Sequence, residues 1–245
     1  MSRTGQRSAV RRALDRLRDS FPNQYARGRN AIALAELYAH RWRSRSQAAD
    51  AYPDDFWDFH DVGDWDNFAR AVLAHTRARS IVDVGCGHGL ALAALAHIDP
   101  ALRLKGYDDS PAALARAARR DLSVERLDIV ALPPSRAETL AADLRSFDLA
   151  ICLEVAEPLP SWHAGKLVTI VSAPRRLVFS AAHPGQGGRL HVNEQPASYW
   201  IARLSARGMR LAPADDDFRR DVAALDLPAW YGQNVHLFER DVTRS

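Results

Sequence analysis

The sequence predicts an α/β fold, a mostly parallel β-sheet with helices on both faces, preceded by a helical N-terminal extension. From residue 80 onward, short apolar runs rich in β-branched residues alternate with longer amphipathic runs. Strands that alternate with helices are typical of parallel sheets covered on both faces. Several apolar runs end in an acid, and the first leads directly into the glycine-rich stretch GCGHG at 85–89.

The composition is that of a single sizeable domain with an appendage. The chain has 245 residues, of which 47% are hydrophobic, enough for a full core. No apolar run approaches the length of a membrane span, and the first twenty residues lack the apolar middle of a secretory signal. The two cysteines, Cys86 and Cys152, form neither a disulfide framework nor a metal-ligand pattern. We therefore expect a cytoplasmic protein with no metal ion and no membrane partner.

The N-terminal 74 residues are predicted to be a helical extension. Residues 6–20 and 29–43 place Ala, Leu and Tyr at helical spacing, with arginine on the other face. Residues 1–48 carry eleven arginines and three acids, whereas residues 49–69 carry seven aspartates and no basic residue. A basic arm is one way to grip nucleic acid. We prefer a solvated helix, or an arm against the acidic stretch, because the arm has few aromatics and no RNA-binding motif.

The first half of the sheet is read from strands that end in acids. SIVDV at 80–84 is a short β-branched strand, and the helix at 89–98 stops before Pro100. LRLKGYD at 102–108 is the next strand. The helix at 110–120 begins with a Ser cap and a Pro and ends in arginines, all favourable helix signals.

The second half is read from the same two patterns. The remaining strands are predicted at 124–130, 147–154, 175–182 and 234–240. Helices are predicted to end at 167–171 and to span 196–209, where Gly208 stops the helix, and 215–225. Because ligands bind beyond the carboxyl ends of parallel strands, the acids Asp83, Asp108 and Glu154 are expected to meet at one edge.

The glycine loop predicts a nucleoside-like cofactor. Gly85, Gly87 and Gly89 lie where a strand turns into a helix, so they permit positive φ and a close approach of the ligand to the backbone. Asp108 follows Gly89 by 19 residues, at the tip of the next strand. A carboxylate there can accept hydrogen bonds from ribose hydroxyls.

The spacing of the glycines indicates which nucleoside cofactor the site would bind. The dinucleotide fingerprint requires two residues between its second and third glycines, and here only His88 separates them. Asp83 would repel a pyrophosphate, but it suits a ligand with a cationic ammonium and a sulfonium. S-adenosylmethionine carries both, so it is the predicted cofactor.

Three motifs carry a family resemblance. IVDVGCGHG at 81–89, GYDDS at 106–110 and FDLAICLEVAE at 147–157 resemble, in order and spacing, class I S-adenosylmethionine-dependent methyltransferases. AAHPGQGG, HVNEQPASYW and the late WYGQNVHLFER are similar to a bacterial branch that includes small-molecule and natural-product enzymes. The resemblance implies a Rossmann-like sheet of seven strands with an antiparallel final hairpin, formed by a methyltransferase domain at residues 75–245 after an extension at 1–74.

The resemblance also implies the site residues. The expected cofactor-binding residues are Asp83, Gly85, Cys86, Gly87, Gly89, Asp108, Asp109, Leu153 and Glu154. Relatives often carry an acid followed by His after the fourth strand, and here Pro158 follows Glu157. Asp128 and Asp143 are both candidates for the acid that reads adenine.

A general base would be useful to a hydroxyl or amine acceptor, which has to lose a proton. The candidate catalytic residues are His183, His191 and Glu154, and His60 is a less favoured candidate. The alternative interpretation is structural: His183 hydrogen-bonds a loop, and His191 braces a segment whose Asn193 and Gln195 cap the next helix. The acidic, aromatic segment 51–66 is expected to form a lid over the cofactor.

The predicted function is methyl transfer to a small-molecule acceptor in bacterial secondary metabolism. Oxygen is the expected acceptor atom, with nitrogen or carbon as alternatives. The competing hypotheses are an RNA or protein methyltransferase that uses the basic arm, a nicotinamide oxidoreductase, and a binder without activity. Nucleic acid is the less favoured partner, and the sequence does not indicate an oligomeric state.

Overall fold

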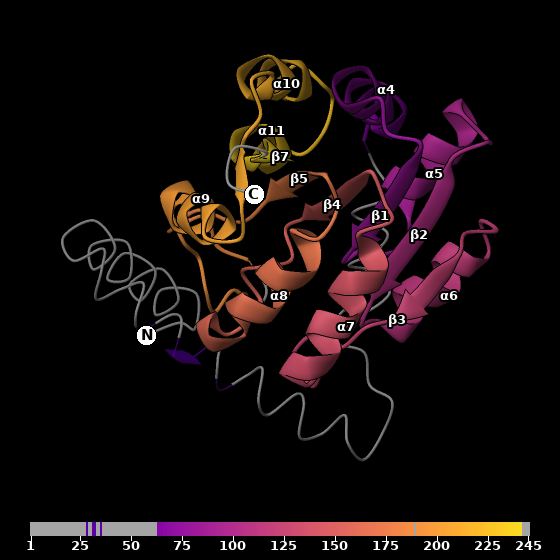
Figure 1. The fold of residues 1–245 in the computed structure, drawn as a ribbon. Helices are drawn as coiled ribbons and strands as arrows, with labels where there is room; N and C mark the ends of the chain where they lie inside the picture. The colour runs from indigo at the N-terminus through magenta and orange to yellow at the C-terminus, as the bar shows by residue number, and fades with distance from the viewer. Residues whose placement is uncertain (1–27, 29–30, 33–34, 36–62, 189, 242–245) are drawn as a thin grey trace, which may run out of the picture.

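One seven-stranded sheet organises the molecule (Figure 1). The computed structural model describes residues 63–188 and 190–241, together with residues 28, 31, 32 and 35. The strand order is β3-β2-β1-β4-β5-β7-β6. The strands are β1 (Ser80–Val84), β2 (Arg103–Asp108), β3 (Val124–Arg126), β4 (Leu149–Leu153), β5 (Arg176–Ser180), β6 (Met209–Leu211) and β7 (His236–Arg240).

Strand β7 alone runs against the other six strands. β7 pairs antiparallel with both β5 and β6, whereas all pairs among β1 to β5 are parallel. This arrangement confirms the predicted mostly parallel sheet of seven strands and its antiparallel final hairpin.

Helices connect the strands and cover both faces of the sheet (Figure 1). They are α4 (Trp65–Thr76), α5 (Leu90–Ile98), α6 (Pro111–Ala118), α7 (Pro134–Leu144), the 3-10 turn η1 (Ser161–His163), α8 (Ala164–Val171), α9 (Ala197–Ser205), α10 (Asp215–Ala223) and α11 (Ala229–Asn234). No helix in the described residues is long and apolar enough to cross a membrane.

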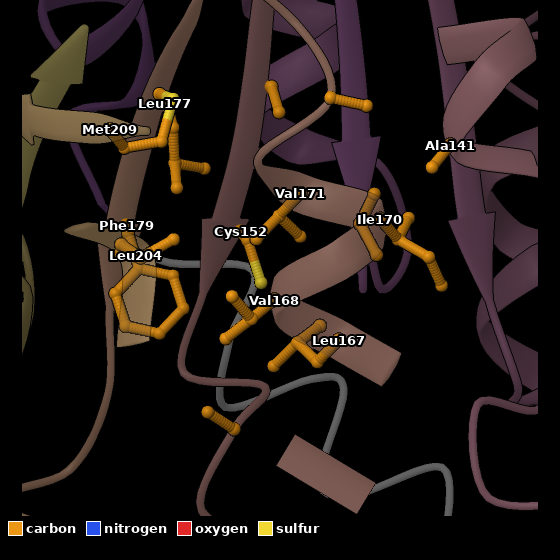
Figure 2. Packing of buried hydrophobic residues seen from close by; sticks show 14 of the residues in the cluster. Ala141, Cys152, Leu167, Val168, Ile170, Val171, Leu177, Phe179, Leu204 and Met209 are labelled. Atoms are coloured by element: carbon orange, nitrogen blue, oxygen red, sulfur yellow. The ribbon is translucent and has the colours of Figure 1, made fainter. Parts of the chain in front are cut away.

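Each face of the sheet has its own apolar core, because neighbouring residues of a strand point to opposite sides. Val82 packs in the core under α7, α8 and α9, and Ile81 packs in the core under α4, α5 and α10. Figure 2 shows the first core, where Cys152 of β4 faces Val168 of α8. Both cysteines are therefore free thiols that behave as buried apolar groups.

The structure corrects several boundaries; among them, the helices predicted at 110–120 and 215–225 end at 118 and 223, and the strand predicted at 234–240 begins at 236. β3 ends at Arg126, short of the predicted 130, because its partner strand β2 ends at Asp108 and Asp128 then turns the chain by accepting the Ala131 N–H on its side chain (2.9 Å). The predicted helix at 196–209 stops at Ser205, and Gly208 (φ +76°) turns the chain into β6. The strand predicted at 147–154 begins at 149, and that predicted at 175–182 ends at 180.

Three elements have no counterpart in the sequence-based prediction. The buried face of α7 is formed by Ala137, Ala141 and Leu144, and two small residues give little apolar periodicity. β6 buries only Met209, as expected of a short edge strand, and α11 has only six residues.

Most of the predicted extension lies outside the described residues. This holds for the helix at 6–20 and for residues 51–62 of the lid predicted at 51–66. Of the helix predicted at 29–43, the described residues 31, 32 and 35 are helical, as is residue 28 just before it. The extension's last helix, α4, packs against α5.

Candidate functional site

The site lies at the carboxyl edge of the sheet, where the strand order reverses. β1 is paired with β2 on one side and with β4 on the other, so the chain connections leave this point in opposite directions. In open α/β sheets such a switch point forms the ligand-binding crevice. The turns that follow β1 and β4 line this crevice.

The glycine turn after β1 needs its glycines for steric reasons. Gly85, Gly87 and Gly89 have φ of +84°, +51° and +82°. A Cβ atom on Gly85 would lie 2.2 Å from Cγ2 of Val155, which follows β4. The N–H groups of Gly85 and Cys86 both donate to the Tyr107 carbonyl (2.7 and 2.9 Å), which ties the turn to β2.

Asp108 fixes the same turn from the tip of β2. Its Oδ2 accepts the Gly87 N–H and its Oδ1 accepts the Ser110 N–H, both at 2.8 Å. A carboxylate oxygen can accept more than one hydrogen bond, so a ribose hydroxyl can bind to the same group. Ser110 also caps α6 by accepting the Ala113 N–H (3.1 Å).

Asp83 lies beneath the glycine turn with 5% of its surface exposed. Burial, and then the nearby Asp108 charge, raise the pKa of its carboxyl to about 8. Among the described residues, no Lys or Arg forms an ion pair with Asp83. A cationic ligand would favour the ionised form of this buried acid, and the ammonium end of S-adenosylmethionine is such a group.

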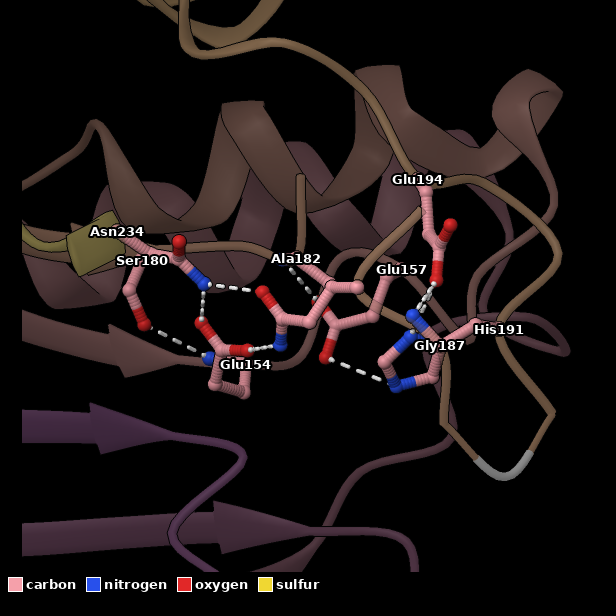
Figure 3. A network of polar contacts seen from close by, with 9 residues as sticks. Glu154, Glu157, Ser180, Ala182, Gly187, His191, Glu194 and Asn234 are labelled. Atoms are coloured by element: carbon pink, nitrogen blue, oxygen red, sulfur yellow. Dashed lines mark hydrogen bonds and ion pairs between the residues drawn. The ribbon is translucent and has the colours of Figure 1, made fainter. Parts of the chain in front are cut away.

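Glu154, the residue after β4, has a strained backbone with φ +53°. Its N–H donates to the Ser180 carbonyl and to Ser180 Oγ, both at 3.1 Å, which holds it at the tip of β5. Its Oε2 accepts an N–H of the Gln186 side chain (3.0 Å). Its Oε1 accepts an N–H of the Asn234 side chain (3.1 Å), a contact that Figure 3 shows.

Comparisons with known proteins agree with this geometry. Residues 82–170 match a family described as "Methyltransferase domain". Ubiquinone biosynthesis O-methyltransferase from Azotobacter vinelandii is 28% identical over 208 residues, covering 81% of this chain and 79% of that protein. The protein of the same name from Pseudomonas paraeruginosa is 29% identical over 206 residues, with the same coverage.

These matches support a class I S-adenosylmethionine-dependent methyltransferase as the identity of the chain. Its fold is shared with a solved structure, the sugar N-methyltransferase KedS8 from Streptoalloteichus sp ATCC 53650. That structure has a TM-score of 0.51 at 18% identity, and it covers 83% of this chain and 92% of its own. When bound, the cofactor supplies an activated methyl group on a sulfonium, so the protein's residues have to hold and orient it.

The other cofactor residues predicted for this methyltransferase lie around the same edge. Cys86 is buried, burial raises the pKa of its thiol, and its Sγ lies 3.6 Å from the Gly87 carbonyl, so it is a neutral part of the turn. Leu153 ends β4 opposite Ser180 of β5. Asp109 is half-buried and forms an ion pair with Arg126 (3.0 Å), so its carboxylate is turned toward β3.

The two adenine candidates lie at opposite ends of the methyltransferase sheet. Asp128 comes two residues after β3, at the carboxyl edge, and its Oδ1 accepts the Ala131 N–H (2.9 Å). Asp143 is exposed in the last turn of α7, and its carbonyl accepts the Ser146 hydroxyl near the start of β4. Of the two, only Asp128 is near the glycine turn's edge of the sheet.

His191 is held between two glutamates (Figure 3). Its Nδ1 lies 3.1 Å from Glu194 Oε1, and its Nε2 lies 3.8 Å from Glu157 Oε1. Burial raises the pKa of Glu157, followed by the Glu154 charge, so the protonated form of Glu157 is favoured beside the ring. Gly188 permits the arrangement, since a Cβ there would lie 2.2 Å from His191 Nε2. Both ring nitrogens thus face carboxylates of the protein.

The same loop corrects the expected helix cap. The N-cap of α9 is Pro196, with no side-chain cap, and the Gln195 amide instead donates to Asn193 Oδ1 (3.0 Å). Glu194 closes the loop by accepting the N–H groups of Gly185 (2.8 Å) and Gly187 (2.7 Å). His183, the other predicted histidine, is half-buried, and its carbonyl accepts the Gln186 N–H (3.1 Å).

Three residues of this edge escaped the sequence-based prediction. Gln186 and Asn234 bind Glu154, and Tyr231 of α11 packs edge-on against Trp65 (ring centroids 5.4 Å apart). Burial raises the pKa of the Tyr231 hydroxyl, followed by the charges of Glu154 and Glu157, so it remains a hydrogen-bond donor. The motifs GQGG and WYGQN contain these residues, but no spacing rule connects them to Glu154.

Among the described residues, no three His, Cys, Asp or Glu side chains gather in a way that could hold a metal ion.

Proposed function

We propose that this methyltransferase transfers the methyl group to a hydroxyl oxygen of a small-molecule acceptor. The observation that carries the proposal is the similarity to ubiquinone biosynthesis O-methyltransferases, which spans 81% of the chain and extends well beyond the family match at 82–170. The relatives' names point to quinone biosynthesis and not to secondary metabolism. The proposal therefore concerns acceptor chemistry, with nitrogen and carbon as the alternative acceptor atoms.

In this proposal the described residues divide between the two ligands. Asp83 and the turn at 85–89 hold the methionine end of the cofactor, and Asp108 holds its ribose. The methyltransferase unit is residues 75–245, preceded by the extension at 1–74. Glu154 lies at the transfer point, and Tyr231 and the loop at 181–196 line the acceptor side, because their polar groups lie around Glu154.

The acceptor hydroxyl has to lose its proton as the new bond forms. Glu154, His183 and His191 are the candidate bases, and their surroundings differ. The His191 ring is occupied by Glu194 and Glu157, which favours a bracing role, whereas Glu154 and His183 have no partner of opposite charge among the described residues.

An acceptor screen tests the function. The purified protein is incubated with S-adenosylmethionine and a panel of phenols, catechols, aliphatic alcohols and their amine counterparts, and products are read by the mass of one added methyl group. We expect products from hydroxylated acceptors. RNA is included because residues 1–48 carry eleven arginines; methylated RNA with no small-molecule product would overturn the proposal.

The base is then identified from pH–rate profiles with the best acceptor. Glu154→Gln, His183→Asn and His191→Asn are compared for kcat/KM between pH 5 and pH 10. The variant that removes the base is expected to lose about 10²- to 10⁴-fold in rate together with the acidic limb of the profile. Substitution of a residue that only braces the loop would instead lower the stability of the protein and leave the shape of the pH–rate profile unchanged.

A further inference from the structure

A ring of three side chains, Glu154, Gln186 and Asn234, joins three separate segments of the chain at the transfer point. Figure 3 shows Glu154 and Asn234 side by side. The Gln186 amide donates to Glu154 Oε2 (3.0 Å), and the Asn234 amide donates to Glu154 Oε1 (3.1 Å). The Asn234 amide also donates to Gln186 Oε1 (2.8 Å), which closes the ring. We call these three residues the amide clamp.

The amide clamp holds a carboxylate without neutralising it. Both donors are neutral amides, and among the described residues no Lys, Arg or His forms a salt bridge with Glu154. An ionised carboxylate only accepts hydrogen bonds, so amide N–H groups on both oxygens match it. The clamp thus fixes the direction of the carboxylate and leaves its charge available to a ligand.

Other acids share the crevice with Glu154. The hydroxyl of Tyr231 lies within electrostatic range of Glu154, Glu157 and Asp83, which come from the ends of β4 and β1. Ionised carboxylates gathered in this way repel one another, so each either keeps its proton, as is favoured for Glu157, or needs a cation nearby. S-adenosylmethionine carries a positive sulfur, whereas its product, S-adenosylhomocysteine, carries a neutral one.

We infer that Gln186 and Asn234 are positioning residues, which direct the Glu154 carboxylate at the cofactor's sulfonium and make the site prefer S-adenosylmethionine to S-adenosylhomocysteine. The inference rests on the proposed function's placement of Glu154 at the transfer point. Because the charge on sulfur disappears when the methyl group leaves, the clamp also weakens the hold on the spent cofactor. Gln186 belongs to the loop at 181–196 and Asn234 to α11, so both elements are tied to this selectivity.

The test uses cofactor binding and needs no acceptor. Gln186→Met and Asn234→Leu keep the approximate size of each side chain and remove its N–H donors. Calorimetry gives the Kd of S-adenosylmethionine, S-adenosylhomocysteine and sinefungin, which carries an ammonium near the position of the transferred methyl. We expect Asn234→Leu to weaken the binding of S-adenosylmethionine and of sinefungin about tenfold, and Gln186→Met to weaken it about threefold. The Kd of S-adenosylhomocysteine should change less than about twofold in both variants.

Gln233→Met is the matched control, since it removes an exposed amide one residue before Asn234 on the same helix. Its ratio of the two cofactor affinities should equal that of the wild type. Asn234 is buried, so a variant there can fail to fold; Gln186 is exposed, and its variant keeps the test decisive. A parallel loss of all three ligands, or no loss of any, would overturn the inference.

The outcome also separates this inference from the proposed function. A wild-type protein that methylates no hydroxylated acceptor, yet loses its preference for the charged cofactor in both clamp variants, contradicts the proposed acceptor and supports the clamp. If the protein methylates hydroxylated acceptors but the clamp variants keep the wild-type ratio of cofactor affinities, the proposed acceptor is supported and the clamp is contradicted.

Discussion

At the scale of single residues, Asp83 and Asp108 show how two acids of one edge take different electrostatic roles. Asp108 accepts two backbone N–H groups and remains half-buried at the strand tip. Asp83 is enclosed, and its pKa is raised to about 8 because burial disfavours the charged form. The first is suited to hold neutral hydroxyls, and the second responds to a cation and to pH.

Cofactor binding should therefore depend on pH through Asp83. A cationic ligand favours the ionised carboxylate, so binding below pH 8 has to displace a proton. We expect the affinity for S-adenosylmethionine to rise about tenfold per pH unit from pH 6 to pH 8 and then to level off. Calorimetry in two buffers of different ionisation enthalpy measures the proton released. In Asp83→Asn the affinity should be lower and nearly independent of pH; an equal slope in both proteins would contradict the role of Asp83.

We expect Asp83 to lower the stability of the cofactor-free protein. The pKa of Asp83 is about 8 in the folded protein against 3.8 for the ordinary carboxyl, so the unfolded chain loses its proton first as pH rises. Stability present below pH 3.8 is thus progressively lost up to about pH 8. We expect Asp83→Asn to have the higher Tm, by a margin that grows between pH 5 and pH 8. Thermal unfolding without cofactor measures it, and a constant margin would argue against the raised pKa.

Removing Asp108 should abolish tight cofactor binding. Asp108→Ala loses the acceptor for the ribose hydroxyls and releases the Gly87 N–H, so we expect at least a 100-fold weaker Kd for S-adenosylhomocysteine, or about 2.7 kcal/mol. Asp143→Ala is the control, because Asp143 is an exposed acid at the opposite edge. Equal affinities in the two variants would show that the cofactor does not bind at the tip of β2.

At the scale of elements, the glycine turn and the turn after β4 act as one unit. Gly85 packs so closely against Val155 that no side chain fits between the two turns. The loop at 181–196 adds a third segment, which is held by Glu194 at its base and by Gln186 at Glu154. The site is therefore built where three connections are braced against each other, on a rigid parallel sheet.

A methyl group on Gly85 should test this packing. Gly85→Ala combines φ +84° with a Cβ atom 2.2 Å from Val155, so we expect a loss of about 2–4 kcal/mol in the free energy of unfolding. Gly165→Ala, in α8 with no atom near the added Cβ, should instead gain about 0.5–1 kcal/mol. Urea unfolding measures both. Adding Val155→Ala should restore part of the Gly85→Ala loss, and strict additivity would contradict the contact.

At the scale of the whole molecule, two apolar cores on opposite faces keep the carboxyl edge in register. The core under α4, α5 and α10 joins a helix that precedes the first strand to one that precedes the last. Phe68 of α4 is 1% exposed in this core. Residues 65–76 therefore contribute to the stability of the sheet as well as to the aromatic contact between Trp65 and Tyr231.

Truncation of Phe68 should destabilise the whole sheet. We expect Phe68→Ala to lower the free energy of unfolding by about 3–5 kcal/mol, the range for a buried aromatic that leaves a cavity. Trp162→Ala, at an aromatic that is 59% exposed on η1, should change it by less than about 0.5 kcal/mol. Denaturant unfolding followed by circular dichroism compares the two. If Phe68→Ala lost as little stability as Trp162→Ala, α4 would be peripheral to the fold.

The sequence by itself determined the order of strands and helices, the glycine turn, and the placement of Asp83 and Asp108 at strand ends. These features depend on residues only a few positions apart, because side-chain periodicity, helix caps and glycine conformations are local. The same locality explains the misses: α7 presents alanines, β6 is an edge strand, and α11 is short, so each carries a weak periodic signal.

Only the tertiary structure decided which polar side chains meet at the site. Glu154 is 32 residues from Gln186 and 80 from Asn234, and these contacts form only once β4, β5 and α11 reach the same edge. The capture of His191 by Glu157 and Glu194 depends in the same way on a loop folding back over β4. Hydrogen bonds between loops have no sequence period, since their partners are set by the order of strands in the sheet.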